Sequence, residues 1–356
     1  MSYFEKAKEK FNKLKNKKDV YVLAFESSCD DTCVGLVKNG TQVLASAISS
    51  QIDIHARFGG VVPEVASRNH LLSISNLLKT VLHDSGFNLN DVDAVAVTYG
   101  AGLMGALMVS VSYAKTLAYA LELPLIKVNH IKAHISANYI QHQDLKPPYA
   151  ALVVSGGHTA LVNVKDYVNN ELIATTHDDA IGEAFDKVAK VLGLGYPGGP
   201  KIEKCALNGE ANIKFINKPT SGHFENSFSF SGLKSAVINY LHKKEQNHEE
   251  ICVEDVCASF QKEAIGIVSK TCVEYCVKEK VDKLVMAGGV ACNKALRKEL
   301  EEEGDKVGVK IIYPEPKLCT DNAMMVGAEA YYLIKSGEGL SDIDLCADPS
   351  INLKYS

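Results

Sequence analysis

Several features that would assign a function at once are missing from this sequence of 356 residues. No apolar run approaches the ~20 residues of a membrane-spanning helix, so we expect no membrane association. The ten cysteines include no C-x-x-C pair and no secretory signal precedes them, which favours reduced thiols and a cytoplasmic location. Basic residues are not in excess, since the net charge is −5. That charge argues against a nucleic-acid-binding protein without excluding a local basic patch.

The first 19 residues lack arginine, although they contain seven lysines and two glutamates. A transit peptide would be rich in arginine and poor in acidic residues, so we do not expect one. Apolar side chains recur at three- and four-residue spacing, at Phe4, Ala7, Phe11 and Leu14. This spacing predicts an amphipathic helix that lies as an extension on the protein surface.

The rest of the chain is long enough for two domains and contains a repeated pattern of strands. Three short apolar runs separated by turns occur twice, and each group is followed by helical segments and a later strand. The predicted strands are 20–25, 32–37 and 42–47, then 150–154, 159–164 and 171–175. We expect an α/β protein with the duplicated, RNase H-like fold of actin and sugar kinases. In that fold, turns after the first strand of each half hold phosphates across a cleft.

The break between the halves is expected near Pro147-Pro148. The predicted organisation is a lysine-rich extension, an N-terminal subdomain, a C-terminal subdomain and a tail, at residues 1–19, 20–140, 141–337 and 338–356.

Two histidines, His130 and His134, follow a strand-like run and are four residues apart. On a helix they lie on the same face, so both imidazoles can reach one metal ion. A zinc peptidase of the H-E-x-x-H type needs glutamate where this chain has Ile131. The pair therefore indicates a metal site without the proteolytic base, provided that a third ligand exists.

Two glycine-rich segments also follow strands. The G-x-G-x-x-G segment 100–105 lacks the acid that dinucleotide binding requires, because Glu122 precedes the next strand instead of ending it. A turn that allows close helix packing is the better interpretation. Gly288-Gly289 and Asn293 form either an adenosine cradle or a structural turn.

Two aspartates have alternative roles. Asp186 either binds substrate hydroxyls or pairs with Lys190 one turn further on. Asp321 either caps the helix predicted from Ala323 or remains free to bind a metal.

The motifs together resemble, in order, those of the TsaD family of tRNA threonylcarbamoyladenosine synthesis proteins, formerly described as O-sialoglycoprotein endopeptidases. The resemblance extends from Val20 to Ile334 and is closest to the bacterial or organellar type. It rests on segments 26–32, 50–52, 59–64, 130–134, 154–159, 196–200, 230–234 and 287–290.

The resemblance implies a metal-dependent acyltransferase that moves a threonylcarbamoyl group from threonylcarbamoyl-AMP to N6 of adenosine 37 in tRNAs reading A-starting codons. His130, His134 and Asp321 match the metal ligands, and Fe(2+) suits such a site better than Zn(2+). Asp30, in the first turn, is our candidate for the catalytic base. The matching substrate-binding positions are Val153, Val154, Ser155, Gly156, Gly157, Asp186, Gly199, Glu203 and Asn293.

The family also implies partners besides tRNA: a paralogous inactive subunit (TsaB-like) and an ATPase subunit (TsaE-like). The predicted helices 63–83 and 105–121 present apolar faces that suit association with such a subunit or with a second copy. Because phosphate contacts dominate affinity for tRNA, a chain of charge −5 is expected to rely on partners for part of the basic surface.

Three other functions fit parts of the sequence. A small-molecule kinase of the actin fold would use Asp30 as base but would leave the histidine pair without a role. A nucleotide-gated binding protein of the heat-shock chaperone type would need a substrate domain, and a metallopeptidase is disfavoured by Ile131. A metal held by both histidines in a cleft beside an adenylate would distinguish among them.

Overall fold

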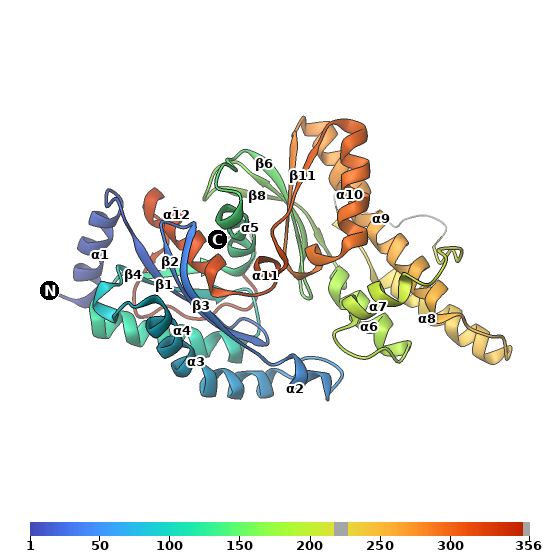
Figure 1. The fold of residues 1–356 in the computed structure, drawn as a ribbon, viewed down its shortest axis with the longest axis horizontal. Helices are drawn as coiled ribbons and strands as arrows, with labels where there is room; N and C mark the ends of the chain where they lie inside the picture. The colour runs from blue at the N-terminus through green and yellow to red at the C-terminus, as the bar shows by residue number, and fades with distance from the viewer. Residues whose placement is uncertain (217–226, 352–356) are drawn as a thin grey trace.

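The computed structural model describes residues 1–216 and 227–351, which form two lobes side by side (Figure 1). Each lobe is built on a six-stranded mixed sheet. The strand order is β12-β5-β4-β1-β2-β3 in the first sheet and β11-β10-β6-β7-β8-β9 in the second. In both, three antiparallel strands in sequence are extended by two parallel strands on the other side, so the predicted duplication is confirmed.

The first sheet is covered on both faces, as its continuous apolar strands require. Alternate residues of β1 point to opposite faces: Leu23 and Phe25 pack under helices α3 and α4, whereas Val22 and Ala24 pack under α12. The elements of this lobe are β1 (Tyr21–Glu26), β2 (Asp31–Lys38), β3 (Gln42–Ser50), α2 (Ile52–Ala56), α3 (Pro63–Ser85), η1 (Leu89–Asp91), β4 (Ala94–Gly100), α4 (Met104–Leu121) and β5 (Leu125–Asn129).

The second lobe places five helices on one face of its sheet, in the largest apolar cluster of the molecule. Its elements are β6 (Tyr149–Val154), β7 (Thr159–Val164), β8 (Asn170–Thr176), α6 (Ile181–Val191), α7 (Gly198–Ala206), β9 (Ser227–Phe228), α8 (Ser231–Gln246), α9 (Val253–Glu279), β10 (Lys283–Ala287), η2 (Gly289–Cys292), α10 (Lys294–Val307), β11 (Lys310–Ile312) and α11 (Pro316–Cys319).

Helix α5 (His130–Gln141) lies between the two sheets, and ten of its twelve residues are buried. Ala133 and Ala137 pack into the core of the first lobe, while Ile131, Ile135 and Tyr139 pack against the second sheet. The helix therefore has no solvent-facing stripe, because each side is covered by a different lobe.

After α11 the chain returns to the first lobe. Helix α12 (Ala323–Ser336) packs on β1, β2 and α5, and β12 (Leu340–Ser341) pairs with β5. The observed packing thus places residues 323–351 with the first sheet, although the sequence pattern assigned those up to 337 to the second subdomain. The end of the predicted tail, 352–356, lies outside the described residues.

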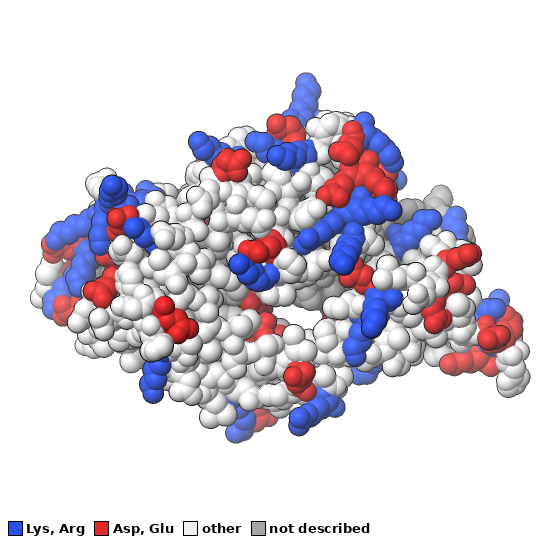
Figure 2. All heavy atoms as spheres, in the orientation of Figure 1, with Lys and Arg blue, Asp and Glu red and all other residues white. Residues whose placement is uncertain are grey.

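The lysine-rich extension forms helix α1 (Tyr3–Leu14), as predicted. Ser2 and Glu5 make a capping box at its start, and Ala7, Phe11 and Leu14 are buried. Lys335 of α12 donates hydrogen bonds to the carbonyl groups of Leu14, Lys15 and Lys17, which anchors the end of α1. Its lysines lie at one end of the molecule in Figure 2.

By length and composition alone, α4 could cross a membrane, although the sequence predicts no membrane-spanning helix. It is the one such helix in the described part of the chain. Ala106, Leu107, Val111 and Ala114 are buried, and the helix packs on β4 and α3. Its apolar composition is therefore that of a core helix with one exposed face.

A buried carboxyl group joins α12 to α5 and makes stability depend on pH. Ser136 Oγ donates a hydrogen bond of 2.5 Å to Glu329 Oε2, and burial raises the pKa of Glu329 from 4.5 to about 7. The folded chain therefore holds this proton more tightly than the unfolded chain. Its contribution to stability is complete below about pH 4.5 and is lost as the pH rises through about 7.

We predict that Glu329→Gln, which keeps an acceptor for Ser136, gains stability relative to the parent protein between about pH 5 and about pH 8, by roughly 1–3 kcal/mol. Thermal unfolding at several pH values measures this difference. The exposed Glu250→Gln serves as control and should show no such trend. A stability difference for Glu329→Gln that does not change with pH would contradict the prediction.

Candidate active site

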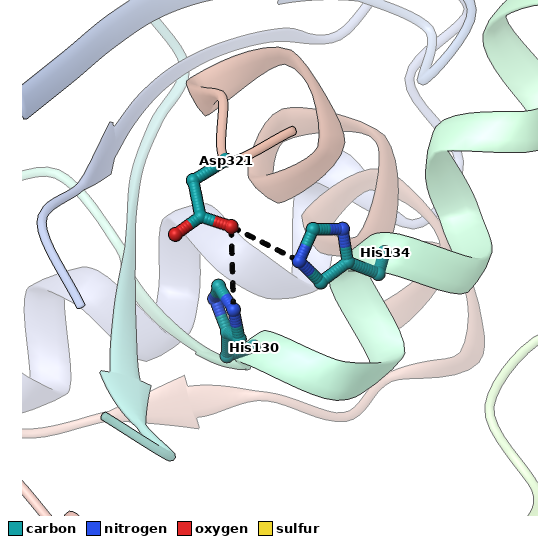
Figure 3. A group of neighbouring side chains, drawn as sticks. All are labelled: His130, His134 and Asp321. Carbon is teal, nitrogen blue, oxygen red and sulfur yellow. Dashed lines mark hydrogen bonds and ion pairs between the residues drawn. The ribbon is translucent and has the colours of Figure 1, made fainter. Parts of the chain in front are cut away.

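Three predicted metal ligands meet where the two lobes join. His130 and His134 extend from α5, and Asp321 lies between α11 and α12 (Figure 3). Asp321 Oδ1 is 3.1 Å from His134 Nε2 and 3.6 Å from His130 Nε2. One candidate ligand atom from each residue lies within 4.8 Å of the others. All three side chains point to a common centre, as one metal ion would require.

Local hydrogen bonds explain why these side chains are free to meet. Asn129 caps α5, because its Oδ1 accepts from the backbone N–H groups of Ile131 and Lys132, and this places His130 in the first turn. At α12 the cap is Asn322, which accepts from the N–H of Met325. Asp321 is therefore not the helix cap, and its carboxylate remains available to a metal.

A buried carboxylate contacts the Nδ1 side of the His130 ring. Glu26 Oε2 lies 3.1 Å from His130 Nδ1 and accepts a hydrogen bond from Thr98, while Glu26 Oε1 accepts from the N–H of Ser28. Burial opposes ionisation of Glu26, but His130 outweighs it and lowers the pKa of Glu26. Burial likewise lowers the pKa of His130, yet Asp321 and Glu26 raise it to about 9. An imidazole oriented by a carboxylate through Nδ1 presents Nε2 to a metal.

The donor set fits a divalent metal. Two imidazoles and one carboxylate leave coordination positions open, as in sites that bind substrate or water. The other ring nitrogen of His134, Nδ1, is buried and has no hydrogen-bond partner among the described residues. Without a metal, the pKa of the partly buried Asp321 carboxylate falls far below its ordinary value, because His130 and His134 outweigh the effect of burial.

Close backbone packing assembles the second part of the site, at the ends of β6 and β10. A Cβ atom on Gly182 would lie 2.6 Å from Ser155 O, one on Gly288 would lie 2.3 Å from Val154 O, and one on Gly198 would lie 2.7 Å from Asp186 Cα. Gly288 also has a φ of +89°, which disfavours other residues. These three glycines let α6, α7 and η2 converge on the turn that follows β6.

The face of this assembly toward the cleft is open. A Cβ atom built on Gly156, Gly157, Gly199 or Gly289 would meet no atom within 4 Å. Helices α6 and α7 begin here, where Thr159 Oγ1 accepts from the N–H of Ile181 and Asp186 accepts from the N–H of Gly198. A helix N-terminus beside an open glycine turn suits phosphate oxygens. Figure 2 shows a hollow between the lobes.

The other predicted substrate positions surround this turn. Val153 and Val154 are buried in β6, and Ser155 Oγ accepts from the N–H of His158, which closes the turn. Asp186 accepts a 2.7 Å hydrogen bond from the N–H of Gly198 and so orders the start of α7. The alternative pairing of Asp186 with Lys190 is thereby replaced by a backbone contact.

Two predicted positions already have partners within the protein. Asn293 Oδ1 accepts from the N–H of Leu296 as the cap of α10, and its Nδ2 donates to Gln261. Glu203 Oε1 accepts from the N–H of Lys294, beside Asn293. Both side chains therefore fix the position of η2 and α10. These contacts correspond to the structural turn that was one of the two interpretations of the Gly288–Asn293 segment.

Asp30 lies in the turn between β1 and β2, facing both parts of the site. Burial and the charge of Asp321 raise its pKa, and burial, with a smaller effect of the Asp30 charge, raises the pKa of Asp186 in the other lobe. The neighbouring Asp31 reaches a pKa of about 7, mainly through burial. An aspartate with a raised pKa is a stronger base than one in water.

The glycine segment 100–105 has a packing role, as predicted. The N–H of Gly102 donates to Pro349 O and that of Leu103 donates to Ser28 O, so neither is available to a pyrophosphate. A Cβ on Gly102 would lie 2.5 Å from Ser28 O. The glycine is needed because the turn contacts the backbone that precedes Asp30.

Reasoning from the sequence missed Glu26 and His158 as site residues. Glu26 ends the first strand, and its signal was an acid at the end of an apolar run. His158 closes the glycine turn with its ring centroid 6.2 Å from that of His130, and burial lowers its pKa to about 4. Its ring therefore links the glycine turn to the metal-competent residues.

The fold and the site define a class: an actin-like α/β protein with a metal-competent centre where its two lobes meet. The structure of HypF from T. kodakarensis superposes with a TM-score of 0.60 at 14% identity, over 92% of this chain and 49% of that one. Component A of (R)-2-hydroxyglutaryl-CoA dehydratase from Acidaminococcus fermentans gives 0.52 at 14% identity, over 88% and 99%. These likenesses show the fold alone.

The sequence comparisons identify the family. The model of TsaD, tRNA N6-adenosine threonylcarbamoyltransferase, matches residues 42–328. Proteins of that name from Clostridium perfringens (strain SM101) and Clostridium novyi (strain NT) are 54% and 50% identical to this chain. The alignments cover 93% and 94% of this chain, and 98% of each relative. The chain belongs to the TsaD family.

We predict that His134→Ala and Asp321→Ala each lower the affinity for divalent metal by at least about 100-fold, because two remaining ligands bind a metal poorly. Metal analysis after dialysis, with circular dichroism to check folding, measures this. His142→Ala is the matched control, since His142 caps the end of the same helix and its ring is hydrogen-bonded to Tyr313 O, away from the cluster. Full metal content in all three variants would mean that the cluster is structural.

Proposed function

We propose that this chain transfers the threonylcarbamoyl group of threonylcarbamoyl-AMP to N6 of adenosine 37 in tRNAs that read A-starting codons, and releases AMP. The observation that carries the proposal is the placement of the His130–His134–Asp321 cluster beside an open glycine turn, in a chain of the TsaD family. The reaction forms a C–N bond at the carbamoyl carbon and breaks its bond to the phosphate oxygen. One proton leaves the exocyclic amine.

The adenylate is assigned to the second lobe. The N–H groups of Gly156 and Gly157, in the turn after β6, and the start of α6 would hold its phosphate. Gly199 and Gly289 leave room for the nucleoside, while Glu203 and Asn293 keep η2 in place. Asp186 would accept from a hydroxyl group of the substrate with the oxygen that does not bind Gly198.

The metal is assigned to His130, His134 and Asp321, with Fe(2+) preferred over Zn(2+) because the three ligands leave several positions open. When bound, it would supply Lewis acidity toward the carbamoyl oxygen. Glu26 keeps His130 in the ligating orientation. Asp30 accepts the proton of the amine, a role supported by its raised pKa and its position between the lobes.

The transfer is tested by incubating the protein with adenine-37 tRNA, threonine, bicarbonate, ATP, an adenylate-forming enzyme and the candidate partner subunits. Nucleosides are then analysed by mass spectrometry. We expect threonylcarbamoyladenosine, and at least about a hundredfold less of it with Asp30→Asn, because the amine proton then lacks its acceptor. No modified nucleoside with any set of partners would refute the assignment.

The partners are assigned to the exposed side of the first lobe. Helices α3 and α4 cross where a Cβ on Gly105 would meet Ser67, and next to this crossing Leu71, Leu72 and Met108 are more than half exposed. An apolar face of this kind suits a helical partner. We assign it to a paralogous inactive, TsaB-like subunit, with a TsaE-like ATPase completing the assembly in the cytoplasm.

Basic residues alternate with acidic ones in Figure 2, so partners would add to the tRNA-binding surface.

We predict that Leu72→Asp weakens association with such a subunit, or with a second copy, by at least about tenfold, because a charge is buried in an apolar contact. Sedimentation and titration with the partner measure the change. Leu207→Asp is the matched control: Leu207 is 80% exposed, against 74% for Leu72, but lies in the other lobe. Equal effects of the two substitutions would mean that another surface forms the interface.

A further inference from the structure

Ten cysteines are present and all are free thiols, yet two pairs of them interact directly. One pair joins Cys292 in η2 to Cys319 in α11, and the other joins Cys205 in α7 to Cys257 in α9. In both pairs one thiol is buried and the other is partly accessible. The two pairs differ in the charged groups that surround them.

The first pair lies beside a cation and next to both parts of the active site. Arg297 Nη2 is 3.6 Å from Cys319 Sγ, and its Nε donates a 2.6 Å hydrogen bond to Ala291 O, next to Cys292. Arg297 also donates to Pro314 O and stacks on the ring of Tyr313. The guanidinium is thereby fixed between η2 and the segment that leads to α11.

These contacts favour the thiolate of Cys292. The hydrogen bond with Cys319 and the charge of Arg297 lower the pKa of Cys292 to about 7, against the opposing effect of burial. A lowered pKa increases the share of thiolate at neutral pH, and the thiolate is the form that reacts with oxidants. Contact with Cys292 and burial raise the pKa of Cys319, as burial and contact with Cys205 raise that of Cys257, but no cation opposes the shift of Cys257.

We propose that Cys292 and Cys319 form a peroxide-sensitive thiol pair that closes to a disulfide. The sulfur of Cys292 attacks one oxygen of hydrogen peroxide, so that an S–O bond forms, the O–O bond breaks and hydroxide leaves. Cys319 then attacks the resulting sulfenic acid. The S–S bond forms, the S–O bond breaks, and the proton of Cys319 leaves with the departing oxygen as water. Two thiols are oxidised and one peroxide is reduced.

The disulfide would connect two functional segments. Cys292 immediately precedes Asn293, which caps α10, and Cys319 is two residues before Asp321. Oxidation therefore ties η2 to the segment that carries the third metal ligand, and it restrains the passage of the chain from the second lobe to the first. We expect this bond to inhibit transfer reversibly, a consequence that rests on the proposed function, whereas the disulfide itself does not depend on it.

The test uses the full chain, treated with hydrogen peroxide and digested with trypsin without reduction. Each cysteine of the pair falls in a tryptic peptide with no second cysteine, residues 284–294 and 318–335. We expect these peptides to appear linked, with the mass of their sum less two hydrogens, and to separate after treatment with a thiol reductant. Before oxidation, iodoacetamide should label Cys292 at least about threefold faster at pH 7 than the exposed Cys252 and Cys346.

Variants separate this pair from the control pair. Cys292→Ser should abolish the linked peptide and make transfer activity insensitive to peroxide, whereas Cys205→Ser should leave both responses intact. The peptides of the control pair, 205–214 and 245–262, should remain unlinked. A link between the control peptides that forms as fast as the other, or no link at peroxide doses that oxidise Cys252, would overturn the proposal. Formation of the disulfide without product in any transfer assay would refute the proposed function alone.

Discussion

The packing of α5 between the two sheets is the constraint on which the rest of the molecule depends. Ten of its twelve residues are buried, some under each lobe, so the helix cannot shift without disturbing two apolar cores. His130 and His134 are held by this helix, and Glu26 at the end of β1 fixes the ring of His130 from behind. The geometry of the metal-competent centre is therefore set by the main contact between the lobes.

The cleft has two walls, one formed by each lobe, and the two walls contribute different chemical groups. The first wall supplies ionisable side chains, namely those of Asp30, Glu26 and the three candidate ligands. Asp321 belongs to this wall although it follows β11, because Cys33 of β2 donates to its carbonyl group and α12 packs on the first sheet. The second wall supplies backbone N–H groups and open space, and it depends on glycines that no other residue replaces without a clash. A group carried on a phosphate bound at the second wall would thus face the side chains of the first.

The sequence was sufficient to predict those elements and side-chain positions that local interactions decide. The strand meanders, the helical register of His130 and His134 and the amphipathic α1 all follow from spacing within a few residues, and the structure contains them. The sequence was insufficient to predict the roles of residues that tertiary contacts decide. Asp321 and Asn322 are equally good caps by residue type. Only the backbone of residues 314–322, the segment that crosses from the second lobe to the first, selects Asn322. The hydrogen bond of Asp186 to Gly198 and the return of residues 323–351 to the first sheet depend on contacts that no short-range pattern records.

The crossing segment connects these observations. Residues 314–322 leave the second lobe, pass Arg297 and η2, and deliver Asp321 to the first lobe. A protein that must bring a phosphate-bound group to a metal needs its two walls in fixed register, and a single peptide segment held at both ends provides that register. Asn322 and Cys33 hold one end, and Arg297 holds the other through Pro314 and Cys319. Because Asp321 lies within this segment, the position of its carboxylate relative to the two imidazoles depends on contacts with both lobes.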